Sequence, residues 1–263
     1  MNFLKRISEC HPKTGELALF WLGQAGFLIK NSKDELLAID PYLSNAVERI
    51  CGLKRMMMPV MEQEELNPDY LVISHHDEDH LDMDIIPDVL KRNPATILYG
   101  PATVCNKCKE ANILKDQVCQ FDKGCQYDLG GYKIEAVFAD HGDHAPDAIG
   151  MLIETEGHML YFSGDTSFQV DRMAYAAQKD IDILVIPING EYGNMNSTEG
   201  VELVNLVKPK LVIPSHFWTF IRHGSNPYLF DREMRIEASS VPFYFMCQGE
   251  RILWDGDIVS AVY

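Results

Sequence analysis

The sequence lacks an apolar run long enough to cross a membrane, and it lacks an excess of basic residues. Its longest apolar runs, such as residues 183–188, are far shorter than the ~20 residues that a membrane helix needs. Lys and Arg number 23 against 39 Asp and Glu, so the formal net charge is −16. This charge repels phosphate backbones and anionic lipids, and we therefore expect neither a nucleic-acid partner nor a membrane partner.

No stretch rich in proline, glycine or serine divides the sequence. A secretory leader is not expected either, because Lys5 and Arg6 are not followed by an apolar stretch in residues 1–10. The seven cysteines are an odd number, which indicates reduced thiols in a cytoplasmic protein rather than a disulfide framework. We predict one domain that spans residues 1–263.

Strand patterns alternate with helix patterns in both halves, which predicts an α/β (α+β) fold. The simplest packing is two mixed sheets face to face with helices outside, a four-layer αβ/βα sandwich. Helices are predicted over 82–92, 172–178 and 198–207, and another begins after Pro101 and carries Cys105 and Cys108 as ordinary thiols. Strands are predicted at 17–22, 26–30, 36–39, 70–74, 96–99, 126–129, 132–138, 149–154, 158–162, 183–188, 211–214, 242–246 and 251–254, the last two as a pair.

The densest chemical signal is the sequence SHHDEDHLD at residues 74–82, directly after the predicted strand 70–74. Imidazole and carboxylate are the ligands that hold Zn, Mn or Fe in proteins. A loop that leaves a strand can turn alternate side chains inward, so His75, Asp77, Asp79 and His80 are candidates to converge on one metal site. A solvated polar loop is the alternative interpretation.

Three later residues, His141, Asp165 and His216, each follow a predicted strand in the same way. Strand ends along one edge of a sheet open onto a common crevice, where sites in such folds form. Each residue alone is typical of an ordinary structural role, but together with the cluster they predict a shared site. His144 is the alternative to His141, because either can reach the crevice from that loop.

These residues, together with several short motifs, resemble a known family. The motifs are WLGQAG at 21–26, IDPY at 39–42, GPAT at 100–103, SGDT at 163–166 and PSH at 214–216. Over nearly its whole length the chain resembles the metallo-β-lactamase-fold hydrolases, and more narrowly the bacterial L-ascorbate-6-phosphate lactonases. The resemblance implies the metallo-β-lactamase fold and two divalent metal ions (Mn, Zn or Fe), whose bound hydroxide attacks a carbonyl or phosphorus.

The resemblance also implies a division of the ligands between the two ions. One ion would be held by His75, Asp77 and His141 and the other by Asp79, His80 and His216, with Asp165 bridging both. Asp79 or Asp77 would relay the proton to the leaving oxygen.

The sequence departs from the family pattern at one ligand, because Asp77 stands where the family has its second His. Either Asp77 is itself a ligand, which favours Mn or Fe over Zn, or His76 turns inward instead. Asp40 and Asp82 are candidates to accept the free N–H of a ligand imidazole. Helix capping is an equal alternative for Asp82.

The expected substrate is a small anionic or phosphorylated sugar lactone or ester. Candidate substrate residues are Asn189 and Glu191 in the loop at 189–195, Trp218 and Arg222 after the last ligand, and Gln24 on the first hairpin. A phosphodiesterase or nuclease, a di-iron redox protein and a non-catalytic binding relative are the alternative functions. The sequence leaves a monomer and a homo-oligomer equally open.

Overall fold

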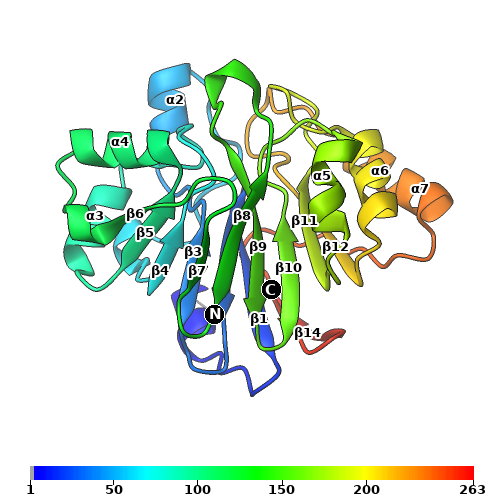
Figure 1. Ribbon diagram of the computed structural model, residues 1–263, viewed down its shortest axis with the longest axis horizontal. Coiled ribbons are helices and arrows are strands. Elements are labelled where there is room, and N and C mark those ends of the chain that lie inside the picture. The colour runs from blue at the N-terminus through cyan, green and yellow to red at the C-terminus, as the bar shows by residue number, and fades with distance from the viewer. Residues whose placement is uncertain (1–2) are drawn as a thin grey trace.

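Two mixed β-sheets pack face to face, with helices on their outer sides, in the computed structural model, which describes residues 3–263 (Figure 1). The helices are α1 (Phe3–Ser8), α2 (Ala46–Cys51), α3 (Ile86–Arg92), α4 (Ala102–Glu110), α5 (Val170–Ala177), α6 (Ser197–Val207) and α7 (Pro227–Glu237). The strands of one sheet are β1 (Leu17–Gly23), β2 (Gly26–Lys30), β3 (Leu36–Ile39), β4 (Tyr70–Val72), β5 (Ile97–Gly100), β6 (Val118–Gln120), β13 (Arg251–Trp254) and β14 (Ile258–Val262). Those of the other are β7 (Gln126–Asp128), β8 (Lys133–Phe138), β9 (Ile149–Thr155), β10 (His158–Phe162), β11 (Ile183–Pro187) and β12 (Leu211–Ser215).

The predicted four-layer αβ/βα sandwich is confirmed. The strand order is β14-β13-β1-β2-β3-β4-β5-β6 in the first sheet and β12-β11-β10-β9-β8-β7 in the second. Helices α2, α3 and α4 lie on the side of the first sheet and α5, α6 and α7 on the side of the second (Figure 1). None of the helices within residues 3–263 is long and apolar enough to cross a membrane.

Strand direction places four loops at the same end of the molecule. Strands β3 to β6 are mutually parallel, as are β10 to β12. Strand β8 runs in the same direction as β10, because both are antiparallel to β9. The loops that follow β4, β8, β10 and β12 therefore leave from the carboxyl ends of strands, where sites in open α/β sheets form.

The main hydrophobic core lies between the two sheets, and a second core lies between the first sheet and its helices. Central strands are covered on both faces, which is why β1 and β11 are buried along their whole length and read as continuous apolar runs. Aromatic contacts join the sheets: the ring centroids of Phe27 on β2 and Phe162 on β10 are 5.5 Å apart, edge to face. This packing fixes the position of the strand ends of one sheet relative to those of the other.

The predicted strand pair at 242–246 and 251–254 is wrong. Strand β13 pairs with β1 and β14, whereas the segment 242–246 makes only an isolated bridge from Phe243 to Val212 on β12. The side chains of Phe243 and Phe245 pack against Phe230 of α7 instead of extending a ladder. Apolar content alone suggested a strand there, and packing under a helix satisfies the same pattern.

Helices α1, α2 and α7 and strands β6 and β14 were not predicted. Helix α7 carried a readable signal, since the Asn226 side chain caps it by accepting the N–H of Leu229, with Pro227 at the first helical position. Of residues 1–10, where no secretory leader is expected, Met1 and Asn2 lie outside the described residues.

All seven cysteines are free thiols. The helix predicted after Pro101 is α4, and it carries Cys105 and Cys108. Burial raises the pKa of Cys105 to about 11 and that of Cys108 to about 12, so both remain protonated thiols near neutral pH.

We expect Gly164→Ala to destabilise the fold more than Gly157→Ala. Both glycines have positive φ, but a Cβ at Gly164 would lie 2.6 Å from the backbone oxygen of Ile149, whereas a Cβ at Gly157 meets open space. Left-handed backbone strain costs each variant about 1–2 kcal/mol, and the clash adds about 1–3 kcal/mol at Gly164 only. Urea unfolding of both variants measures the difference, and equal losses would contradict the expected clash.

Candidate metal centre

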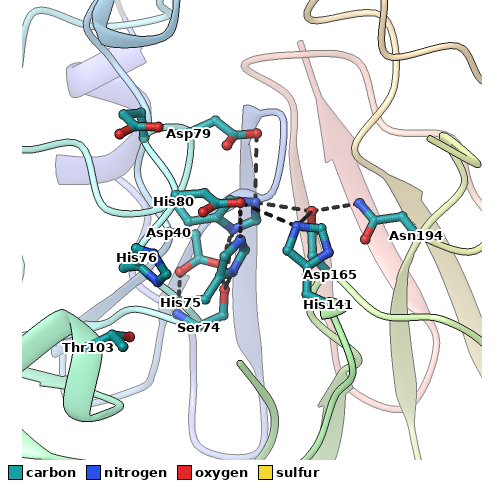
Figure 2. A network of polar contacts seen from close by, with 12 residues as sticks. Asp40, Ser74, His75, His76, Asp79, His80, Thr103, His141, Asp165 and Asn194 are labelled. Carbon is teal, nitrogen blue, oxygen red and sulfur yellow. Dashed lines mark hydrogen bonds and ion pairs between the residues drawn. The ribbon is translucent and has the colours of Figure 1, made fainter. Parts of the chain in front are cut away.

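The carboxyl ends of four strands bring imidazoles and carboxylates to one place (Figure 2). His75 lies in the loop after β4, His141 after β8, Asp165 after β10 and His216 directly after β12. Within residues 3–263, three groups have possible ligand atoms within 4.8 Å of one another: His75, Asp77 and His141; Asp79, His80 and His216; and His75, His80 and Asp165.

The first group surrounds Asp77. Its Oδ2 is 3.4 Å from Nε2 of His75 and 3.3 Å from Nε2 of His141. His75 is fully buried and His141 nearly so, whereas the Asp77 side chain is about one-third exposed. The three ligand atoms face one another from two different sheets, because His75 and Asp77 follow β4 and His141 follows β8.

The second group surrounds Asp79. Its Oδ2 is 3.4 Å from Nε2 of His216 and 3.7 Å from Nε2 of His80. The rings of His80 and His216 are stacked with centroids 5.5 Å apart. This group also joins the two sheets, since His216 follows β12.

Asp165, which belongs to the third group with His75 and His80, lies between the first two groups. Its Oδ2 is 3.1 Å from Nε2 of His216, 3.5 Å from Nε2 of His80 and 3.9 Å from Nε2 of His141. The same oxygen accepts a hydrogen bond of 2.6 Å from Nδ2 of Asn194. One carboxylate oxygen therefore faces imidazoles of both groups.

Hydrogen bonds from behind orient two of the imidazoles. Asp40 accepts from Nδ1 of His80 at 2.8 Å and from the Ser74 hydroxyl at 2.6 Å. Because the Ser74 hydroxyl donates to Asp40, its oxygen accepts from Nδ1 of His75 at 3.0 Å. Both rings therefore carry hydrogen on Nδ1 and direct Nε2 into the centre, and Asp40 orients one of these imidazoles as expected.

The buried charges set the protonation of the cluster. Burial alone would lower the pKa of His216, but Asp165 and Asp79 outweigh burial and raise it to about 9. Burial opposes ionisation of Asp165, but His216 and His80 outweigh it and hold the pKa of Asp165 well below its usual range. For His75, burial and the neighbouring His80 lower the pKa. Protonated imidazole thus compensates the negative charge of the carboxylates in the cluster, and a bound cation would replace the protons in that role.

These residues fit divalent metal ions. The Nε2 atoms of His75 and His80 are buried and have no hydrogen-bond partner within the described chain, although both point at carboxylates. Buried polar atoms in proteins normally have a partner. Neutral imidazole and carboxylate are also the donors that Zn, Mn and Fe take. A cation in each group would supply the missing partner.

Three sequence candidates lie apart from the groups. His144 is exposed in the short turn after His141. Figure 2 shows His76 away from His80 and Asp165, on the side toward Thr103. Asp82 contacts no imidazole and caps no helix with its side chain; it accepts from the backbone N–H of Leu43 and Ser44 and from the Ser44 hydroxyl. The expectation that Asp82 orients an imidazole is therefore wrong.

The candidate substrate residues lie in different settings. Gln24 is buried inside the second group, with Nε2 2.7 Å from Oδ2 of Asp79. Asn189 is buried, and its Oδ1 has no hydrogen-bond partner in the described chain. Glu191 and Arg222 are exposed, and Trp218 is 52% exposed.

Sequence reasoning missed two residues of the site. Asn194 donates to Asp165, and its only signal was membership of the polar loop after β11. His223 stacks on His216 with ring centroids 4.9 Å apart. Burial and the adjacent His216 lower the pKa of His223 to about 4, so this ring is neutral. No spacing rule connects either residue to the motif, because the contacts are made by loop conformation.

The fold and the clustered imidazoles define the class of protein. The family model described as the beta-lactamase superfamily domain matches residues 18–216, so the chain belongs to that superfamily. Its arrangement is the metallo-β-lactamase fold, as the sequence predicted.

Individual relatives agree with this assignment. A protein of Polynucleobacter asymbioticus named "UPF0173 metal-dependent hydrolase" is 29% identical over 261 residues, which cover 90% of this chain and 86% of that protein. A protein of the same name from Pyrobaculum islandicum is 29% identical over 88% of this chain and 97% of its own length. Among solved structures, the metallo hydrolase Igni18 from Ignicoccus hospitalis superimposes with a TM-score of 0.74 at 20% identity, covering 91% of this chain and 98% of that one.

We expect Asp40→Asn to lower metal affinity by about 10- to 100-fold, the usual cost of losing a carboxylate that orients a ligand imidazole. Asp40 accepts three hydrogen bonds, from the Ser74 N–H on Oδ1 and from the Ser74 hydroxyl and Nδ1 of His80 on Oδ2. An amide has only one acceptor oxygen, so its NH2 group would face at least one of these donors, and His80 would lose its charged acceptor. Chelator competition measures the affinity.

Asp82→Asn is the matched control, because Asp82 is an equally buried carboxylate that contacts no imidazole. It should lower stability while leaving metal affinity near the wild-type value. Equal loss of affinity in both variants would show that Asp40 acts only through folding.

Proposed function

We propose that this protein is a metal-dependent hydrolase that uses two divalent cations. The observation that carries the proposal is the pair of His/Asp groups that face Oδ2 of Asp165. Nε2 of His75 and Nε2 of His80 point at carboxylates there and have no hydrogen-bond partner within the described chain. The names of the similar proteins support the same class of reaction. Iron redox chemistry and a purely binding role have no comparable support.

The residues divide between the cations as the two groups do. His75, Asp77 and His141 would hold one, Asp79, His80 and His216 the other, and Asp165 would contact both. Bound divalent cations lower the pKa of water toward neutrality and stabilise the negative charge that develops on an attacked carbonyl.

The chain's own carboxylates supply proton transfer. Oδ2 of Asp77 and Oδ2 of Asp79 would bind the cations, which leaves the second oxygen of either carboxylate to take the proton that leaves water and return it to the leaving oxygen. Asn194 fixes the orientation of Asp165 through its hydrogen bond. Asp77 in place of an imidazole adds negative charge and oxygen ligation, which favours Mn or Fe over Zn.

The substrate that we propose is a small lactone or ester with an anionic group, such as a phosphorylated sugar lactone. This finer assignment rests on the motif resemblance described above. Trp218 and Arg222 follow His216 on one loop, and Asn189 lies on another. Arg222 would pair with the substrate anion, and Oδ1 of Asn189 would accept from a substrate hydroxyl.

Metal analysis joined to a substrate panel tests the function. We expect two divalent cations per wild-type chain and turnover of sugar-phosphate lactones above turnover of bis-p-nitrophenyl phosphate and RNA. Robust turnover of either phosphodiester with inert lactones would replace the lactonase assignment by a phosphodiesterase. Bound iron with a visible chromophore and no hydrolysis would replace it by a redox protein.

Asp165→Ala should abolish turnover and lower the metal content below two ions per chain, because it removes the carboxylate that faces both groups. Elemental analysis and the panel above measure both effects. The control is His144→Ala on the neighbouring loop, which is exposed and should retain metal and activity. Near-normal turnover of Asp165→Ala would refute the two-cation centre.

Asp77→His should shift the metal preference toward zinc, since an imidazole replaces the carboxylate between His75 and His141. Competition between Zn and Mn for the metal-free chain measures this preference. His76→Ala is the control and should leave it unchanged. The opposite pattern, an effect of His76→Ala alone, would assign His76 as the ligand.

A further inference from the structure

Gln24 is held against the metal centre by its backbone. It lies in the turn between β1 and β2 with a left-handed φ of 52°, which is unusual for a residue other than glycine. Its carbonyl oxygen accepts from the backbone N–H of His216 at 3.1 Å and from Nε1 of Trp21 at 3.1 Å. Strained backbone of this kind persists where the surrounding structure requires it, and here it ties the first hairpin to a candidate ligand.

The side-chain amide of Gln24 lies within the second group of ligands. One amide atom, Nε2, is 2.7 Å from Oδ2 of Asp79, 2.9 Å from Nε2 of His216 and 3.0 Å from Nδ1 of His223. The other amide atom, Oε1, is buried and has no hydrogen-bond partner in the described chain. Gln24 is only 1% exposed, so bulk solvent does not reach that atom.

A cation in this group changes which amide atom is favoured there. The terminal amide has two orientations, related by a half turn, that exchange oxygen and nitrogen. Without a cation, the charge of Asp79 favours the N–H side. With a cation held by Asp79 and His216, the positive N–H side is repelled and the oxygen is attracted. An amide oxygen is a ligand of the kind that Mn and other hard divalent ions accept.

We propose that Gln24 supplies its amide oxygen as a further ligand for the cation held by Asp79, His80 and His216. His223 supports this orientation, because its Nδ1 lies beside the same amide atom and as a ring N–H donates to the oxygen. The inference rests on the proposed two-cation centre. It makes the two cation sites unequal, with a larger ligand set at the second site.

Metal binding to the full chain tests the proposal without any substrate. The metal-free protein is titrated with Mn²⁺ and with Co²⁺, whose visible spectrum reports coordination number. Gln24→Glu keeps an oxygen in place and adds charge, and it should tighten one of the two sites by about tenfold or more. Gln24→Met removes the oxygen at similar length, so it should weaken that site by about tenfold and intensify the Co²⁺ absorption as coordination number falls.

Gln178→Glu is the matched control, because it adds the same charge at an exposed position at the end of α5. It should change neither affinity nor spectrum. Thermal unfolding of the metal-free variants shows whether each is folded. If Gln24→Met does not fold, Gln24→Glu alone shows whether the change raises or lowers cation affinity.

If Gln24 acts as a hydrogen-bond donor instead of a ligand, the affinity of Gln24→Glu for a cation should change in the opposite direction. If Gln24 only donates its N–H to Asp79, Gln24→Glu places two carboxylates in contact and weakens cation binding, which overturns the proposal. Unchanged affinity in Gln24→Glu overturns it as well. A wild-type chain that binds no divalent cation overturns the two-cation centre itself, a result distinct from a failure at Gln24 alone.

Discussion

The attraction between buried imidazoles and buried carboxylates is the interaction on which the arrangement of this site depends. Isolated charges are too costly to bury, so each must have a partner of opposite charge or a bound ion. Oδ2 of Asp165 lies within 4 Å of Nε2 of three imidazoles, and the resulting field shifts the pKa values of Asp165 and His216 in opposite directions. Such a balance of charge can be met by protons or by cations. Nε2 of His75 and Nε2 of His80 have no hydrogen-bond partner among the described residues, which favours cations.

The two-sheet architecture provides this convergence, because each sheet contributes part of every group. Some of the backbone strain lies at the same place, since Gln24, Asp40 and His216 all have positive φ. The carbonyl of Gln24 accepts from the backbone N–H of His216, and the carboxylate of Asp40 accepts from Nδ1 of His80. An unstrained backbone at these residues would redirect those groups. Strain at functional positions is tolerated when the surrounding packing holds it, and the core between the sheets does so here.

The fold of this protein and its proposed reaction rest on different observations. The superfamily assignment follows from the match over residues 18–216 and from the layered sheets. The reaction has to be argued from the site, because one fold supports many activities. The donor types and the burial of Asp165 and His80 argue for a bound cation, and hydrolysis is the reaction that we propose for it. Trp218 and Arg222 are the exposed residues that we propose for substrate preference.

The sequence alone determined the four-layer fold, most of its strands, and the set of imidazoles and carboxylates that meet, since apolar periodicity and strand-end motifs are local patterns. It could not choose between Asp77 and His76 or between His141 and His144, because adjacent residues differ only in the direction that a loop turns them. Nor could it place Asn194 and His223, or show that Gln24 lies among the candidate ligands and that Asp82 does not orient one. Those choices were made by tertiary structure, for a physical reason: the contacts span two sheets, and only their packing brings such distant backbone segments within the reach of a hydrogen bond.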